Sequence, residues 1–131
     1  MCDAPMREAF KRCGRGSLDE RVNMSSQYCI LFITVGNEEE ANIIARTLVE
    51  DSLAACVGMI PQKSIYSWKG KIVEDTEVLL IIKTKTDLFS PLKDVVLKAH
   101  SYEVPEIIRV NIEEGHQPYL QWIEETVKTP S

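Results

Sequence analysis

The segment from His100 to Glu106 gathers the side chains best suited to chemistry. It places an imidazole, a phenol and two carboxylates, those of His100, Tyr102, Glu103 and Glu106, within seven positions. Imidazole suits copper and zinc, and carboxylates can complete the coordination of such an ion. Each residue taken singly is more typical of a helix end or a solvated surface. Taken together they predict a functional site, because groups of complementary type converge on one short segment.

The proline within this segment makes it an ordered entry to a strand. Pro105 restricts the preceding Val104 to extended geometry and cannot donate to a sheet ladder. A helical pattern with apolar residues at 88, 92, 95, 96 and 99 comes before the segment. After it, apolar and polar residues alternate from 108 to 112. We therefore expect the cluster to lie between the end of a helix and the start of a strand.

Composition argues against several classes of function. The net charge is −5, and outside residues 1–26 ten Lys or Arg stand against sixteen Asp or Glu. Such an acidic body argues against a nucleic-acid surface, which needs clustered cations. No stretch reaches the ~20 apolar residues that a membrane helix requires. No nucleophile adjoins His100 or Glu103, and no glycine-rich phosphate loop is present, so we predict that the protein is not an enzyme.

The four cysteines, Cys2, Cys13, Cys29 and Cys56, contain no C-x-x-C pair. This spacing argues against a zinc knuckle and a thioredoxin-type motif. Cysteines within apolar runs behave as small hydrophobes, so we expect a reducing, cytoplasmic compartment. Residues 1–26 are polar and lack a sustained period, which predicts a disordered extension. Residues 27–131 then form a single domain.

The remaining elements follow from the apolar pattern. We expect a strand over 28–35, a helix capped by Asn37 with Glu40 as the reciprocal acid, and a hairpin over 54–84. Gly58 and Pro61 suggest a bulge or bend in that hairpin. Asp87 is expected to cap the second helix. Ile108, Val110 and Ile112 are expected to form the buried side of the last strand, before a helix over 118–127.

The element order β-α-β-β-α-β plus a terminal helix predicts an α+β fold. Right-handed crossovers place both main helices on one face of an antiparallel sheet, the ferredoxin-like arrangement. Residues 29–33, 53–57 and 78–82 are nearly continuous apolar runs, whereas a sheet with one wet face should alternate. The second face therefore needs a cover. We predict an obligate homo-oligomer built sheet against sheet.

Five blocks of residues closely resemble the CutA family of divalent-cation tolerance proteins. In order, they are LAACV at 53–57, IYSWKGK at 65–71, EVLLIIKT at 77–84, HSYEVPEI at 100–107 and YLQW at 119–122. The resemblance covers about residues 28–127. It implies a ferredoxin-like protomer, similar in shape to the PII signalling proteins and assembled as a tight homotrimer. It also implies a link to tolerance of copper and other metals, without an established catalytic activity.

The resemblance further implies where a metal would bind. The family histidine falls on His100, and Ser101 replaces a common family proline. A similar bacterial copper site uses two adjacent histidines and a cysteine of the first strand. The matching positions here are Ala99 with His100, and Ile33, so two of those three ligands are absent. We expect copper or another divalent cation to bind weakly, with Glu103 or Glu106 assisting His100.

A second set of family positions implies a cleft between protomers. The residues that match it are Trp68, Lys83, Tyr102, Glu103 and Glu106, and Cys56 matches a family cysteine that we expect to lie in the core. A cleft with a lysine, a tyrosine and a tryptophan could hold an anionic metabolite. A PII-like small-molecule sensor, or a trimeric scaffold or anchoring protein without a metal role, is therefore the alternative to metal binding.

Overall fold

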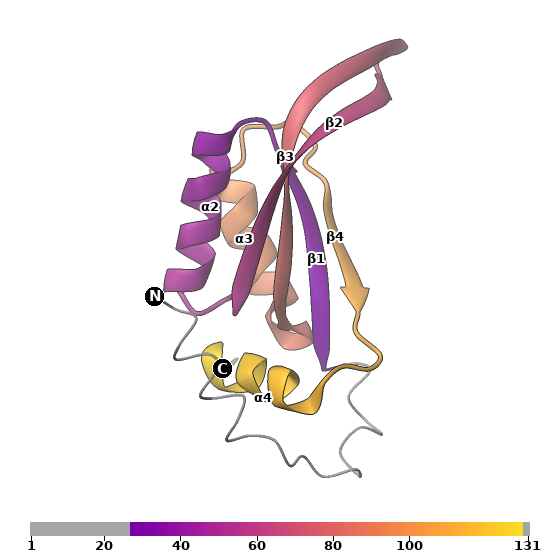
Figure 1. The fold of residues 1–131 in the computed structure, drawn as a ribbon. Coiled ribbons are helices and arrows are strands. Elements are labelled where there is room, and N and C mark those ends of the chain that lie inside the picture. Colours follow the sequence, from indigo (N-terminus) through magenta and orange to yellow (C-terminus); the bar gives the residue numbers. More distant parts are fainter. Residues whose placement is uncertain (1–26, 130–131) are drawn as a thin grey trace.

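The computed structural model describes residues 27–129, and the predicted extension over 1–26 lies outside them (Figure 1). The strands are β1 (Tyr28–Val35), β2 (Cys56–Trp68), β3 (Lys71–Lys85) and β4 (Ile107–Asn111). The helices are α2 (Glu38–Glu50), the short 3-10 helix η2 (Thr86–Leu88), α3 (Phe89–Ala99) and α4 (Gln117–Thr126). Within the described part of the chain, no helix is long and apolar enough to span a bilayer.

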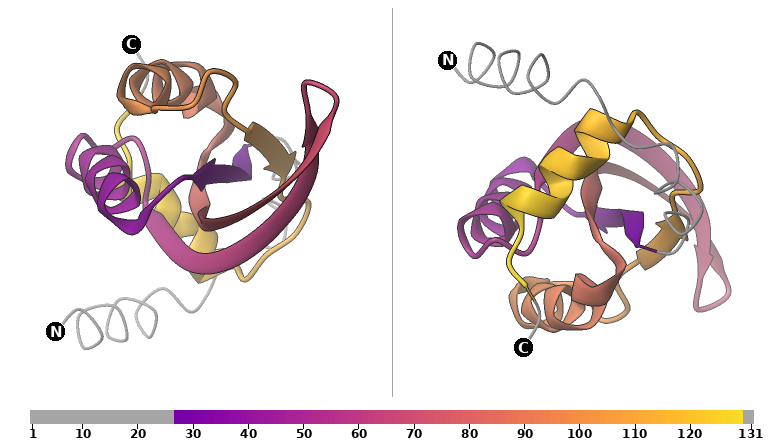
Figure 2. Two further views of the ribbon diagram at one scale, coloured as in Figure 1. Left: turned by 90° about the horizontal axis from the view of Figure 1, so that it is seen from above. Right: turned by 90° about the horizontal axis from the view of Figure 1, so that it is seen from below.

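All neighbouring strands are antiparallel and follow the order β2-β3-β1-β4. Helices α2 and α3 lie side by side against one face of this sheet, and α4 crosses one of its ends (Figures 1 and 2). This arrangement confirms the predicted α+β, ferredoxin-like fold with its additional terminal helix. Strands β1 and β3 are central, so their inward side chains are the best protected in the protomer.

The first helix begins as the sequence predicts, but one of its acids has another partner. The Asn37 side chain accepts a hydrogen bond from the Glu40 backbone N–H at 2.8 Å, as an N-cap should. The carboxylate of Glu40 instead accepts hydrogen bonds from Ser101. The expectation that Glu40 completes a reciprocal capping box was therefore wrong, because its side chain holds a segment distant in sequence.

The hairpin covers nearly the expected residues and is more regular than expected. Strands β2 and β3 pair without interruption from Cys56 with Lys83 to Trp68 with Lys71, so the predicted bulge is absent. Pro61 fits without one because β2 is an edge strand, where a missing N–H leaves no ladder partner unpaired. The pairing of β3 with β1 stops at Val78. Residues 62–77, here called the arm, project beyond the rest of the sheet (Figure 1).

Two details of the second half differ from the predictions. Asp87 does not cap α3, because the chain first makes the 3-10 turn η2 and Leu88 occupies the N-cap position. The prediction for the last strand is wrong for Ile108 and Val110, whereas Ile112, just beyond β4, packs against the core as expected. Ile107 packs against the core, whereas Ile108 and Val110 remain 49% and 46% exposed in the protomer.

The sheet has two apolar faces. On the face that α2 and α3 cover, Leu31, Ile33, Leu80 and Ile82 are completely buried. The other face, here called the outer face, lies on the opposite side of the same strands by the pairing register. Its apolar side chains are Ile30, Phe32, Ile60, Leu79, Ile81, Ile108 and Val110, and all of these are half-buried or exposed.

The terminal helix is fixed to one end of the sheet by a partly buried ion pair. The ammonium group of Lys85 lies 2.9 Å from Glu124, and its side chain is only 13% exposed. The hydroxyl of Tyr28 also donates to this carboxylate at 3.2 Å. Leu120 and Ile123 of the same helix are buried against the core. Helix α4 therefore closes the core at the end opposite the arm.

Candidate functional site

The segment that follows α3 is held in place by the first helix. The backbone N–H of Ser101 donates to the Glu40 carboxylate at 2.8 Å, and its hydroxyl donates to the same carboxylate at 2.9 Å. A carboxylate that accepts two hydrogen bonds fixes both the position and the direction of the segment. Residues 100–106, here called the loop, therefore start from a defined anchor on α2.

His100 is a second anchor for the loop. Its side chain is 1% exposed, and Nε2 lies 2.7 Å from the backbone oxygen of Thr34 on β1. Its Nδ1 accepts a hydrogen bond from the Tyr102 backbone N–H at 3.1 Å and lies 3.7 Å from Glu40. These partners assign the proton of the neutral ring to Nε2. Both ring nitrogens are therefore engaged within the protein.

Tyr102 connects the loop to the arm. Its hydroxyl donates a hydrogen bond to the Glu77 carboxylate at 2.7 Å, and its ring lies 4.8 Å from the ring of His100. The same ring covers Gly36, where an added Cβ would come within 3.1 Å of it. Burial and the bond to Glu77 raise the pKa of the Tyr102 phenol, because both favour the neutral form.

Loop and arm enclose a pocket of about 520 Å³, here called the arm pocket. Its aromatic walls are Tyr66, Trp68 and Tyr102, and its charged residues are Glu77, Glu103 and Glu106. Thr34, Ser64, Ser101 and Val104 complete the lining. The arm pocket is thus aromatic and acidic, and no lysine or arginine of the described residues lines it.

The carboxylate at the base of the arm pocket is deeply buried. Glu77 is 6% exposed, and no cationic side chain among residues 27–129 lies within ion-pair distance of it. Nearby on the arm, the Tyr66 hydroxyl donates to Asp75. That hydrogen bond, followed by burial, raises the pKa of Tyr66 to about 12. Two tyrosine–carboxylate pairs therefore stand close together at the arm.

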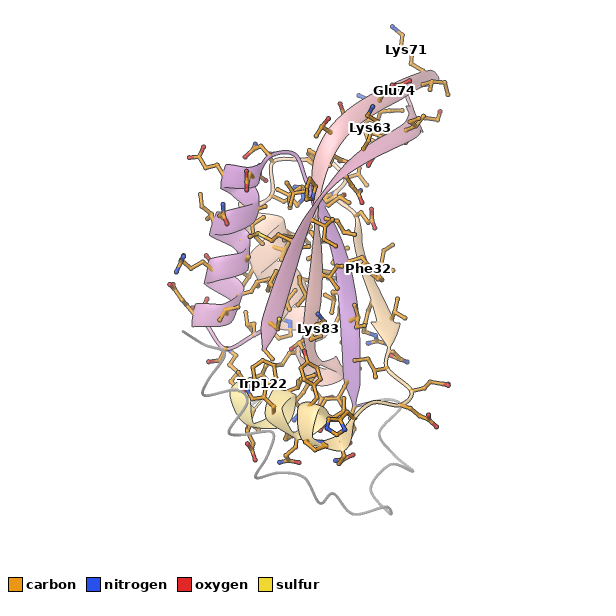
Figure 3. All side chains as sticks on the ribbon, viewed as in Figure 1. Phe32, Lys63, Lys71, Glu74, Lys83 and Trp122 are labelled. Carbon is orange, nitrogen blue, oxygen red and sulfur yellow. The ribbon has the colours of Figure 1, made fainter. Side chains whose placement is uncertain are left out.

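Within one protomer, the residues predicted to line the cleft between protomers lie in two places. Trp68, Tyr102, Glu103 and Glu106 come together in the arm pocket. Cys56 and Lys83 instead form a cross-strand pair at the other end of the hairpin. Figure 3 shows Lys83 within the body of the sheet, far from Lys71, which pairs with Trp68 near the tip of the arm. Cys56 is half-buried there, and not part of the closed core.

The predicted metal ligands do not form a coordination site within one protomer. His100 already has a partner at each nitrogen, and Glu103 is 72% exposed and lies 4.0 Å from Lys69. Ala99 is exposed at the end of α3, and Ile33 is buried in the core. Over residues 27–129, no three His, Cys, Asp or Glu side chains are grouped as metal ligands would be. The donor set of one protomer thus does not fit a tight copper site.

Three residues at the arm were missed from the sequence. Tyr66, Asp75 and Glu77 lie outside the His100–Glu106 segment. Tyr66 and Glu77 fall within the family blocks at 65–71 and 77–84, but no role was predicted for them. Glu77 falls at the polar start of an apolar run that looks like an ordinary buried strand. The register of the hairpin was the available signal. If Trp68 pairs with Lys71 and the pairing continues along both strands, Ser64, Tyr66 and Asp75 lie on the same face as Glu77.

Comparison with known proteins gives a consistent family. The family described as the CutA1 divalent ion tolerance protein matches residues 29–126. Protein CutA of Homo sapiens is 52% identical over 101 residues, which are 76% of this chain and 56% of the human protein. The divalent-cation tolerance protein CutA of Thermus thermophilus is 50% identical over 97 residues, 73% of this chain and 94% of that protein. The chain thus spans little more than half the length of its human relative.

Solved structures agree with the sequence matches. The chain resembles the structure of the periplasmic divalent cation tolerance protein CutA from Archaeoglobus fulgidus, with a TM-score of 0.76 and 42% identity. That match covers 77% of this chain and 99% of the other. The Thermus thermophilus structure gives a TM-score of 0.75 at 47% identity, with the same coverage. The match to the protein from Arabidopsis thaliana, named chloroplastic, is 40% identical over 100 residues.

Proposed function

Because the chain belongs to the CutA1 divalent ion tolerance protein family, we propose that it acts as a homotrimer in the cellular response to divalent metal ions. The outer face carries this proposal. Its apolar side chains have no cover in the protomer, and Ile60, Ile108 and Val110 are each close to half exposed. Exposed apolar patches of this kind mark association surfaces, because burying them removes apolar area from water. In the proposed trimer, the two other copies of the chain would supply the cover for this face.

Sedimentation of the full-length protein tests the assembly. Analytical ultracentrifugation at low micromolar concentration should give a single species with three times the protomer mass. A stable monomer under these conditions would refute the assembly. A dimer would leave the association of the outer faces intact but would contradict the trimer.

We propose that the protein binds copper or another divalent cation with low affinity. The proposed ligands are His100, Glu103 and Glu106, although His100 must release a hydrogen bond to coordinate. This requirement is why we expect weak binding. Calorimetric titration of Cu²⁺ into the trimer should show weaker binding for His100→Ala than for the wild type. His116→Ala is the matched control, because His116 is exposed and precedes α4. Equal affinity of His100→Ala and the wild type would remove His100 from the site.

The arm pocket favours a second function, that of a small-molecule sensor. Its volume of about 520 Å³ is typical of the cavities that hold small molecules in proteins. A thermal-shift screen of metabolites against metal salts separates the two functions. Stabilisation by metabolites, reduced by substitutions in the arm pocket, supports the sensor. In both cases we propose that the protein binds its ligand without transforming it.

We also propose that the protein lies in the cytoplasm. Cys29 and Cys56 are free thiols, and free thiols are typical of a reducing compartment.

A further inference from the structure

We infer that Lys83 of one protomer enters the arm pocket of the next protomer in the trimer and pairs with the buried carboxylate of Glu77. This inference rests on the homotrimer proposed above and deepens it, because it names two charged residues through which neighbouring copies recognise each other. The arm pocket is then a shared site that a single protomer leaves incomplete.

Glu77 is the acidic half of the pair. It is only 6% exposed, and the hydroxyl of Tyr102 donates a hydrogen bond to its carboxylate at 2.7 Å. The phenol carries no charge, and no cationic side chain among residues 27–129 lies within ion-pair distance of Glu77. An ionised carboxylate that has lost most of its hydration is unfavourable unless a cation faces it. Glu77 therefore needs a cation that its own protomer does not supply.

Lys83 is the basic half of the pair. Strand β3 carries Lys83 and Lys85 on the outer face, and Lys85 is already paired with Glu124. Within the described part of the chain, no carboxylate lies within ion-pair distance of Lys83. Its cross-strand neighbours are Ile30 and Cys56. Once the trimer buries the outer face, Lys83 becomes a buried charge that needs a carboxylate from another copy.

The two residues cannot pair within one protomer. Glu77 and Lys83 lie six residues apart on the same strand, β3. A strand rises by ~3.4 Å per residue, so their Cα atoms are separated by about 20 Å, far beyond the reach of an ion pair. Figure 3 shows Lys83 within the body of the sheet, whereas the arm that carries Glu74 projects away from it. A contact between Glu77 and Lys83 must therefore join two copies.

Threefold symmetry provides such a contact. In a closed ring of three copies, each copy presents one surface to one neighbour and a different surface to the other. The arm pocket and the outer face around Lys83 are two such surfaces. The arm projects beyond its own sheet, so its pocket is open to another copy (Figure 1). Each of the three contacts then holds one Lys83–Glu77 pair.

The charges of the two surfaces are complementary. Glu77, Glu103 and Glu106 line the arm pocket, and no lysine or arginine of the described residues does so. The Glu103 side chain is 72% exposed and lies 4.0 Å from Lys69, so water screens its charge. Glu106 is also exposed. Glu77 is the buried carboxylate of the three, so it gains most from the ammonium group of Lys83.

A double-mutant cycle on the full-length protein tests the pair. Dissociation of the trimer is followed in urea by sedimentation. Glu77→Gln keeps the acceptor for Tyr102 but leaves Lys83 without a charged partner, and Lys83→Met leaves Glu77 unpaired. Each substitution alone should lower the urea concentration of half-dissociation by roughly 1 M. The variant with both substitutions buries no unpaired charge, so its loss should be smaller than the sum of the two.

Charge reversal is the second test. Lys83→Glu places a carboxylate against Glu77 of the next copy, and the protein should sediment as species smaller than the trimer. Lys83 is only half-buried in the protomer, so the fold should survive, which circular dichroism verifies. Addition of Glu77→Lys should restore the trimer, and the cycle decides if this variant does not fold. Lys63→Glu is the matched control, because Lys63 is exposed, pairs with Thr76 on the opposite face of the arm and should leave the trimer intact.

The outcomes separate this inference from the homotrimer itself. A wild-type protein that is not a trimer overturns both. A trimeric wild type in which the losses of Glu77→Gln and Lys83→Met add overturns the pair alone, because the two residues then act independently. A Lys83→Glu variant that is as stable a trimer as the wild type does the same. Equal loss of assembly in Lys63→Glu and Lys83→Glu also overturns the pair, because net charge alone would then explain it.

Discussion

The Tyr102 hydroxyl donates a hydrogen bond to the Glu77 carboxylate across 2.7 Å and so joins segments that lie 25 residues apart in the sequence. Tyr102 belongs to the loop after α3, and Glu77 belongs to the base of the arm. The backbone N–H of the same tyrosine donates a hydrogen bond to Nδ1 of His100, and its ring covers Gly36. One side chain thus connects the loop to β3 and to Gly36, just beyond the end of β1, and forms a wall of the arm pocket.

Tyr102→Phe should destabilise the protein measurably. The substitution keeps the ring over Gly36 but leaves the buried Glu77 carboxylate without its donor. The expected loss in free energy of unfolding is about 1–3 kcal/mol, the usual range for an unsatisfied buried group. Urea denaturation at fixed protein concentration measures it. Tyr66→Phe is the control, because the Tyr66–Asp75 bond is exposed and should contribute less. An equal loss in both variants would contradict the importance of Glu77 burial.

Alkaline titration should reveal phenols that ionise late. The pKa of Tyr66 is raised to about 12 by its hydrogen bond to Asp75, and that of Tyr102 is raised by burial and Glu77. A raised pKa means that the folded state holds the proton more tightly than the unfolded state. The resulting stabilisation is complete below the ordinary tyrosine pKa of about 10 and is lost as the pH rises through the raised values.

Ultraviolet absorbance of the phenolate measures this titration directly. Tyr66→Phe and Tyr102→Phe should each remove one late-ionising group from the curve. The unfolded protein serves as the reference, because its phenols should all ionise near a pH of about 10. A folded protein that followed the same curve as the unfolded one would show that the two carboxylates do not act on these phenols.

The Lys85–Glu124 ion pair that fixes α4 should contribute more to the free energy of unfolding than an exposed ion pair does. Glu124→Gln leaves the Lys85 ammonium, which is 13% exposed, without its charged partner. We expect a loss of about 1–3 kcal/mol, the penalty for weakening a hydrogen bond to a buried charged group. Glu50→Gln breaks an exposed i,i+4 pair with Arg46 and should change stability by at most about 0.5 kcal/mol. Thermal or urea unfolding of the two variants should rank them in this order.

A charge on the outer face should prevent assembly. Ile108→Asp places a carboxylate on a surface that the proposed trimer buries, whereas the same residue in the isolated protomer is 49% exposed. Burial of an unpaired charge is strongly unfavourable, so sedimentation should show smaller species than the wild type. Ile43→Asp on α2, at 57% exposure on a helix surface, is the control and should remain assembled. If both variants sedimented like the wild type, the outer face would not be the interface.

Much of the fold was predictable because local pattern and global arrangement agree. The Asn37 cap, the apolar stripe of α2 and the alternation in β4 each depend on near neighbours in the chain. The antiparallel order followed from the sequence of elements, because crossover handedness leaves few alternatives. The errors arose at longer range. Glu40 was expected to complete its own cap but binds Ser101, 61 residues away.

The sequence alone determined the strands, the helices, the two apolar faces of the sheet and the segment on which His100, Tyr102, Glu103 and Glu106 lie. These features depend on spacing and periodicity, which a linear chain displays. Only the tertiary structure decided what the residues do together. It engaged both nitrogens of His100, placed Lys83 and Trp68 of one protomer at opposite ends of the hairpin, and brought the buried Glu77 carboxylate within 2.7 Å of the Tyr102 hydroxyl. Charge pairing and burial depend on distances between segments far apart in the chain, and those distances exist only after folding.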